Sequence, residues 1–236
     1  MIVRMPPELL PSRITFVSFI SVLADTNFLH WVWNTLVVAG SVSFMYTILC
    51  AMAGYAFAQK IFPGRDVIFW IIISTLMLPF FSYLVPLYLL VIDIGIVNTY
   101  WAMILPAMAG PFGIFLMKQY MTTFPAELSN AAKIDGCNEL SCFIRIVLPV
   151  CKPGVVFLAV IVFIAQWNNF LWPLIATTGE RYRVLQVGIA TFAQHTFTDY
   201  GLTMSAATLA ALPIIILFFI FQRHIVGGIS IGAIKG

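Results

Sequence analysis

Charge is scarce in this sequence. Only 9% of its 236 residues are Asp, Glu, Lys or Arg, whereas 61% are hydrophobic, and the mean hydropathy is +1.01. A soluble domain of this length would expose too much apolar surface to stay dispersed. The shortage of charge therefore excludes a soluble fold, and the composition is that of a polytopic membrane protein.

Several signatures of other classes of protein are also missing. A net charge of only +3 provides no basic surface for a phosphate backbone, which argues against nucleic-acid binding. The chain has no GxxxxGK[ST] loop with which to bind ATP, and no GxSxG or HExxH motif of a hydrolase. Its histidines, His30, His195 and His224, lie far apart in the sequence, which argues against a zinc site. We therefore expect no catalytic residue, metal or cofactor in the chain itself.

Long uncharged runs supply the membrane-crossing segments. A helix needs about 20 residues to cross about 30 Å of hydrocarbon, and these runs lack the alternation of barrel strands. We therefore predict an all-α membrane bundle with about five spans, within residues 31–57, 67–91, 98–117, 154–175 and 204–222. Residues 1–30 are predicted to be an external N-terminal segment. Its apolar stretch 14–24 is too short to span, so we expect it to lie at the interface or to pack on the bundle.

The distribution of positive charge predicts the orientation. Five spans divide the Lys and Arg residues between two sides, and the side with more of them holds Lys60, Arg65, Lys118, Lys133, Arg145, Lys152, Arg223 and Lys235. The positive-inside rule makes that side cytosolic, with the loop 124–149 and the tail 223–236. The turn 93–99 and the loop 176–203 then face outward.

The loop 124–149 carries an unusual share of the charges. They are Glu127, Lys133, Asp135, Glu139 and Arg145. Pro125 suits a first helical turn, and Gly136 suits a helix stop. Asn138 can cap a second helix, in which apolar residues recur at helical spacing up to Pro149. The sequence therefore predicts two short amphipathic helices hinged at Asp135–Gly136.

Two interpretations of this loop follow from the spacing alone. It is either an ordinary connector whose apolar faces pack on the bundle, or a docking surface for a cytosolic protein. Leu128, Ala131 and Ala132 form a small, flat apolar patch before the hinge, which favours docking.

The segment "AELSNAAKIDGCNELSCFIRIVLPVCKPG" resembles the EAA loop of the membrane subunits of ABC importers. That pattern is Glu-Ala-Ala, three residues, Gly, and further on Ile-x-Leu-Pro. The matching residues here are Ala131, Ala132, Gly136, Ile146, Leu148 and Pro149. Asn130 stands in place of the motif glutamate, although Glu127 lies one turn earlier.

Other segments are similar to the carbohydrate-importer branch, particularly to the second membrane subunit of the maltose system. They are "NTLVVAGSV", "AGYAFAQKIFPGRD", "LMLPFFSYLVPLYLL", "WNNFLWPL" and "QRHIVGGISIGAIKG". The resemblance covers about residues 14–236, and it makes 31–236 an ABC transporter type-1 transmembrane domain. Such subunits usually have six spans. The first is missing here, so we expect a truncated start, with a true five-span variant as the alternative.

The resemblance implies a permease of the cytoplasmic membrane and not an enzyme. ATP and Mg would be bound by a cytosolic ABC ATPase dimer. The other expected partners are a second homologous permease, an extracytoplasmic substrate-binding protein, a sugar substrate and membrane lipid. The residues implied in ATPase coupling, called the coupling set below, are Glu127, Asn130, Ala131, Ala132, Lys133, Asp135 and Gly136. The tail is also expected to contact the ATPase through Gly232, Lys235 and Gly236.

Polar residues within the fourth span suggest a substrate pathway. The pathway set is Gln166, Trp167, Asn168, Asn169 and Trp172, in which the tryptophans would offer stacking faces to a sugar ring. The alternative is hydrogen bonding between helices, with the tryptophans as ordinary packing residues. The outward loop 176–203 is the expected docking place of the binding protein.

Three other functions compete with sugar import through an ABC system. A glycerol-phosphate ABC permease belongs to the same branch, and no residue separates it from a sugar permease. A secondary transporter would need an ionisable site inside the membrane, and the spans contain no charged residue. An intramembrane enzyme would need a catalytic constellation, and the sequence offers none.

Overall fold

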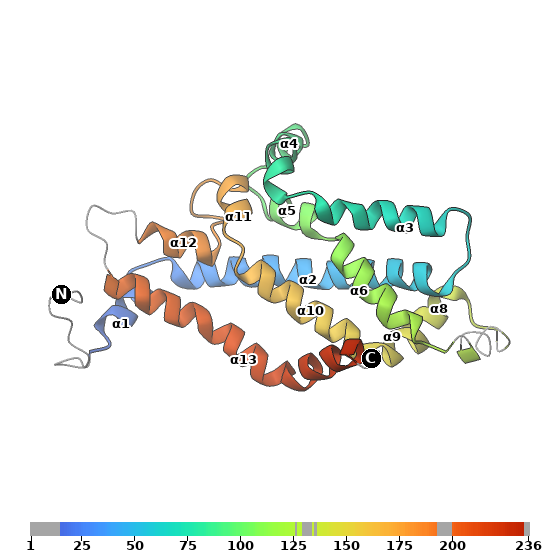
Figure 1. Cartoon of the computed structure of the whole chain (residues 1–236). Coiled ribbons are helices and arrows are strands. Elements are labelled where there is room, and N and C mark those ends of the chain that lie inside the picture. Colours follow the sequence, from blue (N-terminus) through green and yellow to red (C-terminus); the bar gives the residue numbers. More distant parts are fainter. Residues whose placement is uncertain (1–14, 126, 129–133, 135, 193–199, 234–236) are drawn as a thin grey trace.

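The structure is a computed structural model that describes residues 15–125, 127–128, 134, 136–192 and 200–233, with side chains up to Gln222. Every regular element in these ranges is helical (Figure 1). The elements are α1 (Val17–Ala24), α2 (Phe28–Gln59), α3 (Arg65–Ser74), η1 (Thr75–Met77), α4 (Phe80–Asp93), α5 (Tyr100–Ile104), η2 (Leu105–Ala107), α6 (Pro111–Thr122), α8 (Glu139–Cys142), η3 (Phe143–Val147), α9 (Leu148–Val150), α10 (Lys152–Trp167), α11 (Leu171–Ala176), α12 (Leu185–Thr191) and α13 (Tyr200–Ala233). The predicted all-α membrane fold is confirmed.

Helix α2 is the axis of the bundle. Its 32 residues correspond to about 48 Å at 1.5 Å per residue, more than the thickness of a bilayer core. Figure 1 shows α6 and α10 lying along it, with α13 beyond α10. The helix begins beside Thr26, whose hydroxyl accepts the Phe28 N–H at 3.2 Å, and it ends where Lys60 turns extended before Pro63 and Gly64.

Glycines allow α2 to approach its neighbours closely. A Cβ built on Gly54 of α2 would lie 2.6 Å from the Cβ of Met117 in α6. A Cβ on Gly113 of α6 would lie 2.3 Å from the ring of Tyr46 in α2, whose hydroxyl accepts the Gly113 N–H at 3.0 Å. Membrane helices associate by this kind of close packing, because lipid removes the usual hydrophobic drive between them.

The described part of the chain provides up to five spans. Two single helices are long and apolar enough to cross a membrane, Phe28–Gln59 and Tyr200–Gln222. Three bent pairs could each form one more: Arg65–Met77 with Phe80–Asp93 at 102°, Tyr100–Ala107 with Pro111–Thr122 at 46°, and Glu139–Val150 with Lys152–Trp167 at 82°. Pro79 and Pro111 lie at the first two breaks, where a missing N–H and a restricted preceding residue interrupt the helix.

The predicted fourth span, 154–175, needs correction. Helix α10 ends at Trp167, and the apolar stretch continues after a break as the short helix α11. At the break, the side-chain amide of Asn168 donates to the carbonyl of Ile164 at 2.9 Å, so it satisfies one of the last carbonyls of α10. The helical segment that pairs with α10 is instead Glu139–Val150, which precedes it. The second helix of the loop 124–149 therefore leads directly into this span.

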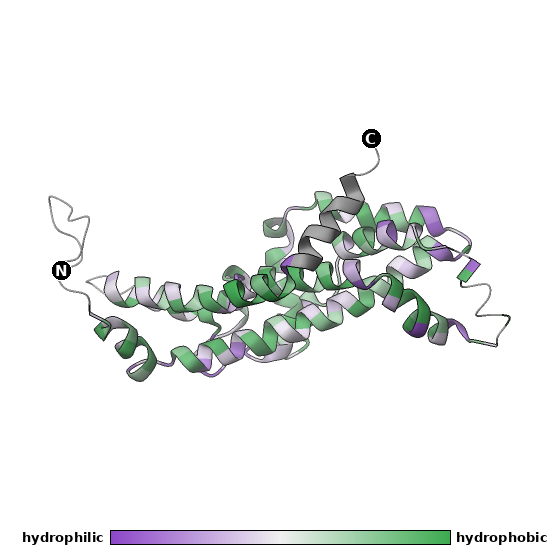
Figure 2. Ribbon diagram, turned by 90° about the horizontal axis from the view of Figure 1, so that it is seen from below, coloured by the Kyte–Doolittle hydropathy of each residue, from purple (hydrophilic) through white to green (hydrophobic). Residues whose placement is uncertain are grey.

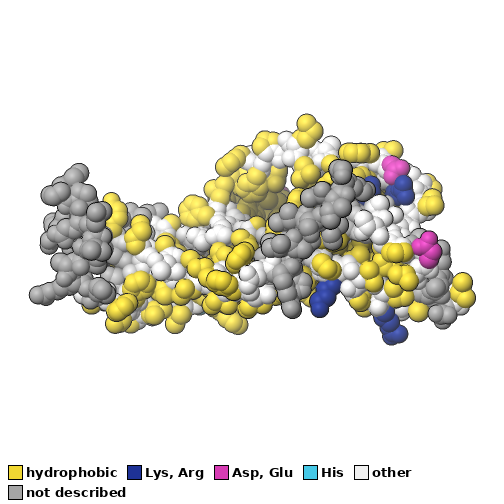
Figure 3. Space-filling view, turned by 60° about the horizontal axis from the view of Figure 1, so that its bottom comes forward, with side chains coloured by type: hydrophobic (Ala, Val, Ile, Leu, Met, Phe, Trp, Pro, Cys, Tyr) yellow, Lys and Arg dark blue, Asp and Glu magenta, His cyan; other side chains and the backbone are white. Residues whose placement is uncertain are grey.

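Apolar side chains cover most of the outer surface, as expected for contact with lipid. Figure 2 shows hydrophobic residues along the helices, and the face in Figure 3 carries its charged side chains near the end that holds α8. The stretch 14–24 contains α1, which packs on α13 through the fully buried Val22. One of its two predicted placements, packing on the bundle, is therefore what the structure has.

Candidate functional site

The loop 124–149 leaves the bundle at the end of α6, beside the last turn of α2. The side-chain amide of Gln59 donates to the carbonyls of Met121 and Phe124, at 2.7 and 3.3 Å. The Met121 carbonyl lies in the last turn of α6, where no further helical turn supplies a donor, and the Phe124 carbonyl lies beyond the end of that helix. Gln59 therefore fixes the start of the loop on α2.

The hinge of the loop has the geometry that the sequence predicts. Gly136 has φ of +82°, a left-handed conformation that residues with a side chain rarely adopt, and nothing lies within 4 Å of a Cβ built there. Two residues later, the Asn138 side chain accepts the Ser141 N–H at 2.8 Å and caps α8. The chain therefore turns in open space and starts a new helix immediately.

An ion pair fixes the far side of the hinge to the same turn of α2. Lys60 pairs with Glu139, the first residue of α8, and the Tyr55 hydroxyl donates to the same carboxylate oxygen at 3.2 Å. The ammonium also lies 4.7 Å from the centre of the Tyr55 ring. Burial lowers the pKa of Lys60, but hydrogen bonds to Glu139 and Tyr55 outweigh it and leave the pKa raised. Lys60 is therefore a cation throughout the physiological range.

The second helix of the loop contains a widened π-helical turn, η3, which ends at Val147, just before Leu148 and Pro149. The N–H of Leu148 bonds to the carbonyl of Phe143, five residues back. A proline ring has no room beneath a carbonyl four residues earlier, so the wider turn accommodates Pro149 inside the helix. Helix continues to Val150, one residue beyond the predicted end.

The amphipathic face predicted for this helix is only partly buried. Phe143 and Val147 pack in the core, whereas Leu140 and Ile144 are 58% and 52% exposed. Before the hinge, Leu128 and Ile134 are 44% and 87% exposed. The loop therefore presents apolar side chains outside the bundle as well as inside it.

The structure describes only part of the coupling set. Glu127 is exposed and helical, and Gly136 forms the hinge. Asn130, Ala131, Ala132, Lys133 and Asp135 lie outside the described residues. In the tail, Gly232 belongs to the backbone of α13, and Lys235 and Gly236 lie outside the described range.

Both tryptophans of the pathway set are packed. The indole N–H of the fully buried Trp167 donates to the Ala210 carbonyl of α13 at 3.1 Å, and its ring stacks on Phe163 at 5.7 Å. Trp172 is 4% exposed and donates to the Ala102 carbonyl at 2.9 Å. These contacts between helices match the packing alternative for the two indoles.

The amides of the pathway set are more accessible. Asn168 is exposed at the break between α10 and α11, and Gln166 and Asn169 are half-buried. The Asn169 side chain donates to the Gln166 side-chain oxygen at 3.2 Å. The structure thus brings three neutral amides together at one break.

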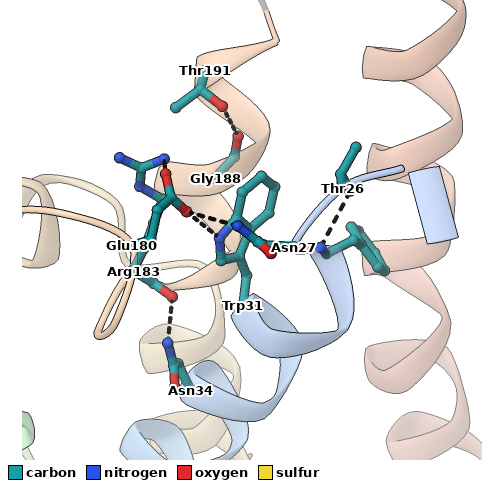
Figure 4. Close-up of polar contacts among 9 residues, drawn as sticks. Thr26, Asn27, Trp31, Asn34, Glu180, Arg183, Gly188 and Thr191 are labelled. Carbon is teal, nitrogen blue, oxygen red and sulfur yellow. Dashed lines mark hydrogen bonds and ion pairs between the residues drawn. The ribbon is translucent and has the colours of Figure 1, made fainter. Parts of the chain in front are cut away.

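The opposite end of α2 holds the loop 176–203, which is predicted to face outward and is called the outward loop here. Figure 4 shows Trp31 and Asn27 on the same side of Glu180, and both donate to its carboxylate, at 3.2 and 3.4 Å. Glu180 also pairs with Arg183 of its own loop. The ring of Trp31 packs on Gly188, where a built Cβ would lie 2.2 Å from the ring. The loop before α12 therefore lies directly on the first turns of α2.

Two buried polar residues of α2 strengthen this attachment. Asn34 donates to the carbonyls of Arg181 and Arg183 at 3.1 and 2.8 Å, and it accepts the Tyr100 hydroxyl at 2.6 Å. Thr35 accepts the N–H of Leu185 at 2.8 Å. Sequence reasoning missed these contacts, although polar residues inside an apolar run are the signal that points to them.

The outward turn 93–99 joins the same end. The N–H of Asn98 donates to the Ala176 carbonyl at 2.9 Å, and its side chain accepts the Thr178 N–H at 3.1 Å. Two segments predicted to face the same side are therefore in contact. Among the described residues, no group of three or more His, Cys, Asp or Glu side chains could hold a metal ion.

The fold is that of a polytopic membrane protein: an apolar helical bundle with a hinged loop on one end and an anchored loop on the other. The family model for the "Binding-protein-dependent transport system inner membrane component" matches residues 51–231. The chain belongs to this family, which makes it a non-catalytic permease subunit of an ABC transporter. Membership implies an ATPase, an external binding protein and a partner permease.

Relatives and a solved structure agree with this membership. The arabinooligosaccharides transport system permease protein AraQ of Halalkalibacterium halodurans is 35% identical over 228 residues, 96% of this chain and 81% of that protein. The sn-glycerol-3-phosphate transport system permease protein UgpE of Brucella abortus is 34% identical over 199 residues, 84% of this chain and 71% of that protein. A bacterial ABC transporter involved in the import of the acidic polysaccharide alginate shares the fold, with a TM-score of 0.81 at 22% identity, over 91% of this chain and 81% of that one.

Proposed function

We propose that this permease carries a carbohydrate or related polyol into the cell by alternating access, driven by ATP hydrolysis in a cytosolic ABC ATPase dimer. ATP and Mg would be bound by that partner. The observation that carries the proposal is the hinged loop 124–149, which projects exposed apolar residues and is fixed on both sides of its hinge to one turn of α2. Rigid-body movement of such an element is a common means of switching a packed bundle between two states.

The coupling set is the proposed contact with the ATPase. A surface that combines Leu128 and Ile134 with the acidic Glu127 suits a groove with an apolar floor and polar rim. Within the same set, Ala131 and Ala132 would allow close approach, and Lys133 and Asp135 would fix polar contacts. Asn130 would take the place of the motif glutamate. Gly232, Lys235 and Gly236 are the proposed contacts of the tail.

The outward loop is the proposed docking place of the substrate-binding protein. Its attachment to α2 through Glu180, Asn34 and Thr35 supports this proposal, because a docked protein needs a surface of fixed shape. Arg181 and Thr178 are exposed on this loop and are available to a partner.

The amides Gln166, Asn168 and Asn169 are the proposed substrate contacts. Amide side chains both donate and accept, so they suit the hydroxyls of a sugar. Trp167 and Trp172, which complete the pathway set, would act by holding the break between α10 and α11 in place.

A glycerol phosphate is the second candidate substrate, favoured by the similarity to the sn-glycerol-3-phosphate permease. A phosphate group is usually met by Arg or Lys, and residues 153–179 contain neither. The carbohydrate proposal is therefore preferred.

Two measurements test the proposed function. A tagged chain should co-purify with an ABC ATPase and a second permease. The binding protein of the same system should bind an oligosaccharide or polyol in calorimetric titration and not glycerol 3-phosphate. Transport by the chain alone in liposomes without ATP would contradict the ABC mechanism. If the binding protein bound glycerol 3-phosphate and no carbohydrate or polyol, glycerol 3-phosphate would be the substrate in place of the proposed carbohydrate.

A further inference from the structure

The last turn of α2 touches the loop 124–149 on both sides of its hinge. Gln59 holds the carbonyls of Met121 and Phe124 before the hinge, and Lys60 with Tyr55 holds Glu139 after it. One helical turn therefore gathers two segments that are separated by Gly136. The two attachments therefore lie on either side of the hinge and leave the residues between them outside these contacts.

The attachment after the hinge is made to a folded element. Glu139 is the first residue of α8, directly after the cap Asn138. One turn further, the ring of Phe143 lies 5.4 Å from the ring of Tyr55, and Phe143 is 5% exposed. A displacement of α8 therefore acts on α2 through a charged contact and a packed aromatic contact at once.

The charged contact is suited to positioning more than to stability. The side chains of Lys60 and Glu139 are 27% and 55% exposed, and exposed ion pairs add little to the free energy of unfolding. Tyr55 nevertheless fixes the geometry of this ion pair, because its hydroxyl donates to the same carboxylate oxygen of Glu139 and its ring lies against the ammonium of Lys60.

Helix α2 continues from this turn to the outward loop. The same helix that ends at Gln59 carries Trp31, Asn34 and Thr35 at its other end, where they hold residues 180–185. A shift of α2 at its cytosolic end would therefore reach the outward loop without passing through any flexible segment.

We infer that Lys60 and Glu139 form the joint through which movement of the loop 124–149 is transferred to α2. Both are positioning residues: neither belongs to the coupling set or the pathway set, and they set how far α2 follows the loop. This inference rests on the proposed coupling role of the loop, and it assigns that role to a particular contact.

Charge reversal in the assembled complex tests the joint. In Lys60→Glu and in Glu139→Lys, like charges face each other, and uptake per ATP hydrolysed should fall about fivefold or more, within the range of typical coupling effects. The double variant Lys60→Glu with Glu139→Lys restores opposite charges and should recover most of the wild-type ratio. Lys60→Arg should keep it. Where a reversal prevents assembly, Lys60→Gln and Glu139→Gln should show a smaller loss of the same ratio.

Asp66→Lys is the matched control. Asp66 forms an ion pair with its neighbour Arg65 at 2.9 Å, close to Lys60, but this pair joins residues of one helix. Uptake per ATP hydrolysed by the Asp66→Lys complex should stay at the wild-type value.

The joint would be refuted if both single variants kept the wild-type uptake per ATP hydrolysed. It would also be refuted if the double variant recovered no more of this ratio than either single variant. An equal fall of ATP hydrolysis and uptake would also overturn it, because that is the result of a purely structural contact. A wild-type complex in which ATP drives no uptake would instead refute the proposed function, so the two failures are distinguishable.

Discussion

At the scale of single residues, Gly54 sets the distance between α2 and α6. Gly54→Ala would place a methyl group 2.6 Å from the Met117 Cβ and 2.8 Å from the backbone nitrogen of Lys118, so one helix must shift. We expect a loss of about 1–3 kcal/mol in stability, the usual cost of overpacking. The melting temperature of the purified complex in detergent measures it.

Gly40→Ala is the control for that substitution. Gly40 belongs to the same helix, and nothing lies within 4 Å of a Cβ built there. Because alanine favours the helix by about 1 kcal/mol over glycine, this variant should melt at the same temperature or higher. If both variants melt alike, close packing at Gly54 does not hold α2 and α6 together.

The adjacent residues Trp167 and Asn168 separate packing from substrate contact. Trp167→Phe removes a buried N–H donor to the Ala210 carbonyl, so we expect a stability loss of about 1–3 kcal/mol and an unchanged apparent KM for uptake. Asn168→Ala removes an exposed amide and should raise the apparent KM with little change in melting temperature. Initial uptake rates against substrate concentration, with melting curves, distinguish them. A raised apparent KM in Trp167→Phe with an unchanged melting temperature would show that the Trp167 indole contacts the substrate.

At the scale of elements, the hinge at Gly136 is the part of the loop on which we propose that coupling depends. Gly136→Val places a β-branched residue at φ of +82°, which costs about 1–2 kcal/mol and favours another backbone conformation. We expect the ATPase to remain bound and to hydrolyse ATP, while uptake per ATP falls. Co-purification, phosphate release and uptake on the same preparation measure the three quantities.

Gly95→Val controls for backbone strain alone. Gly95 has φ of +78° and open space around a built Cβ, and it belongs to the outward turn 93–99. This variant should lose similar stability and keep its uptake per ATP. Wild-type import by Gly136→Val with a normally bound ATPase would refute the role of the hinge.

Local chemistry explains how much of these elements the sequence could predict. The hinge, the Asn138 cap and the two uninterrupted helices α2 and α13 follow from glycine, capping and apolar run length, which act within a few residues. The breaks in the other spans were less predictable. A proline in a membrane helix either kinks or ends it, and the neighbouring helices decide which occurs.

At the scale of the whole molecule, α2 connects the two ends of the bundle that are proposed to meet partners. It carries the outward loop at Asn34 and Thr35, and it carries the loop 124–149 at Gln59 and Lys60. Sequence reasoning named the two loops but not the helix that holds them both. The contacts join residues about 60 to 150 positions apart, and no local pattern predicts which carbonyl a polar side chain will reach.

The most direct test of ATP-driven import is uptake of radiolabelled substrate into liposomes that contain the complete complex with its binding protein. We expect uptake that requires ATP, the ATPase subunit and the binding protein together, and that stops when any one is withheld. Uptake that persists without ATP, or an ATPase that hydrolyses ATP while the intact permease moves no substrate, would contradict it.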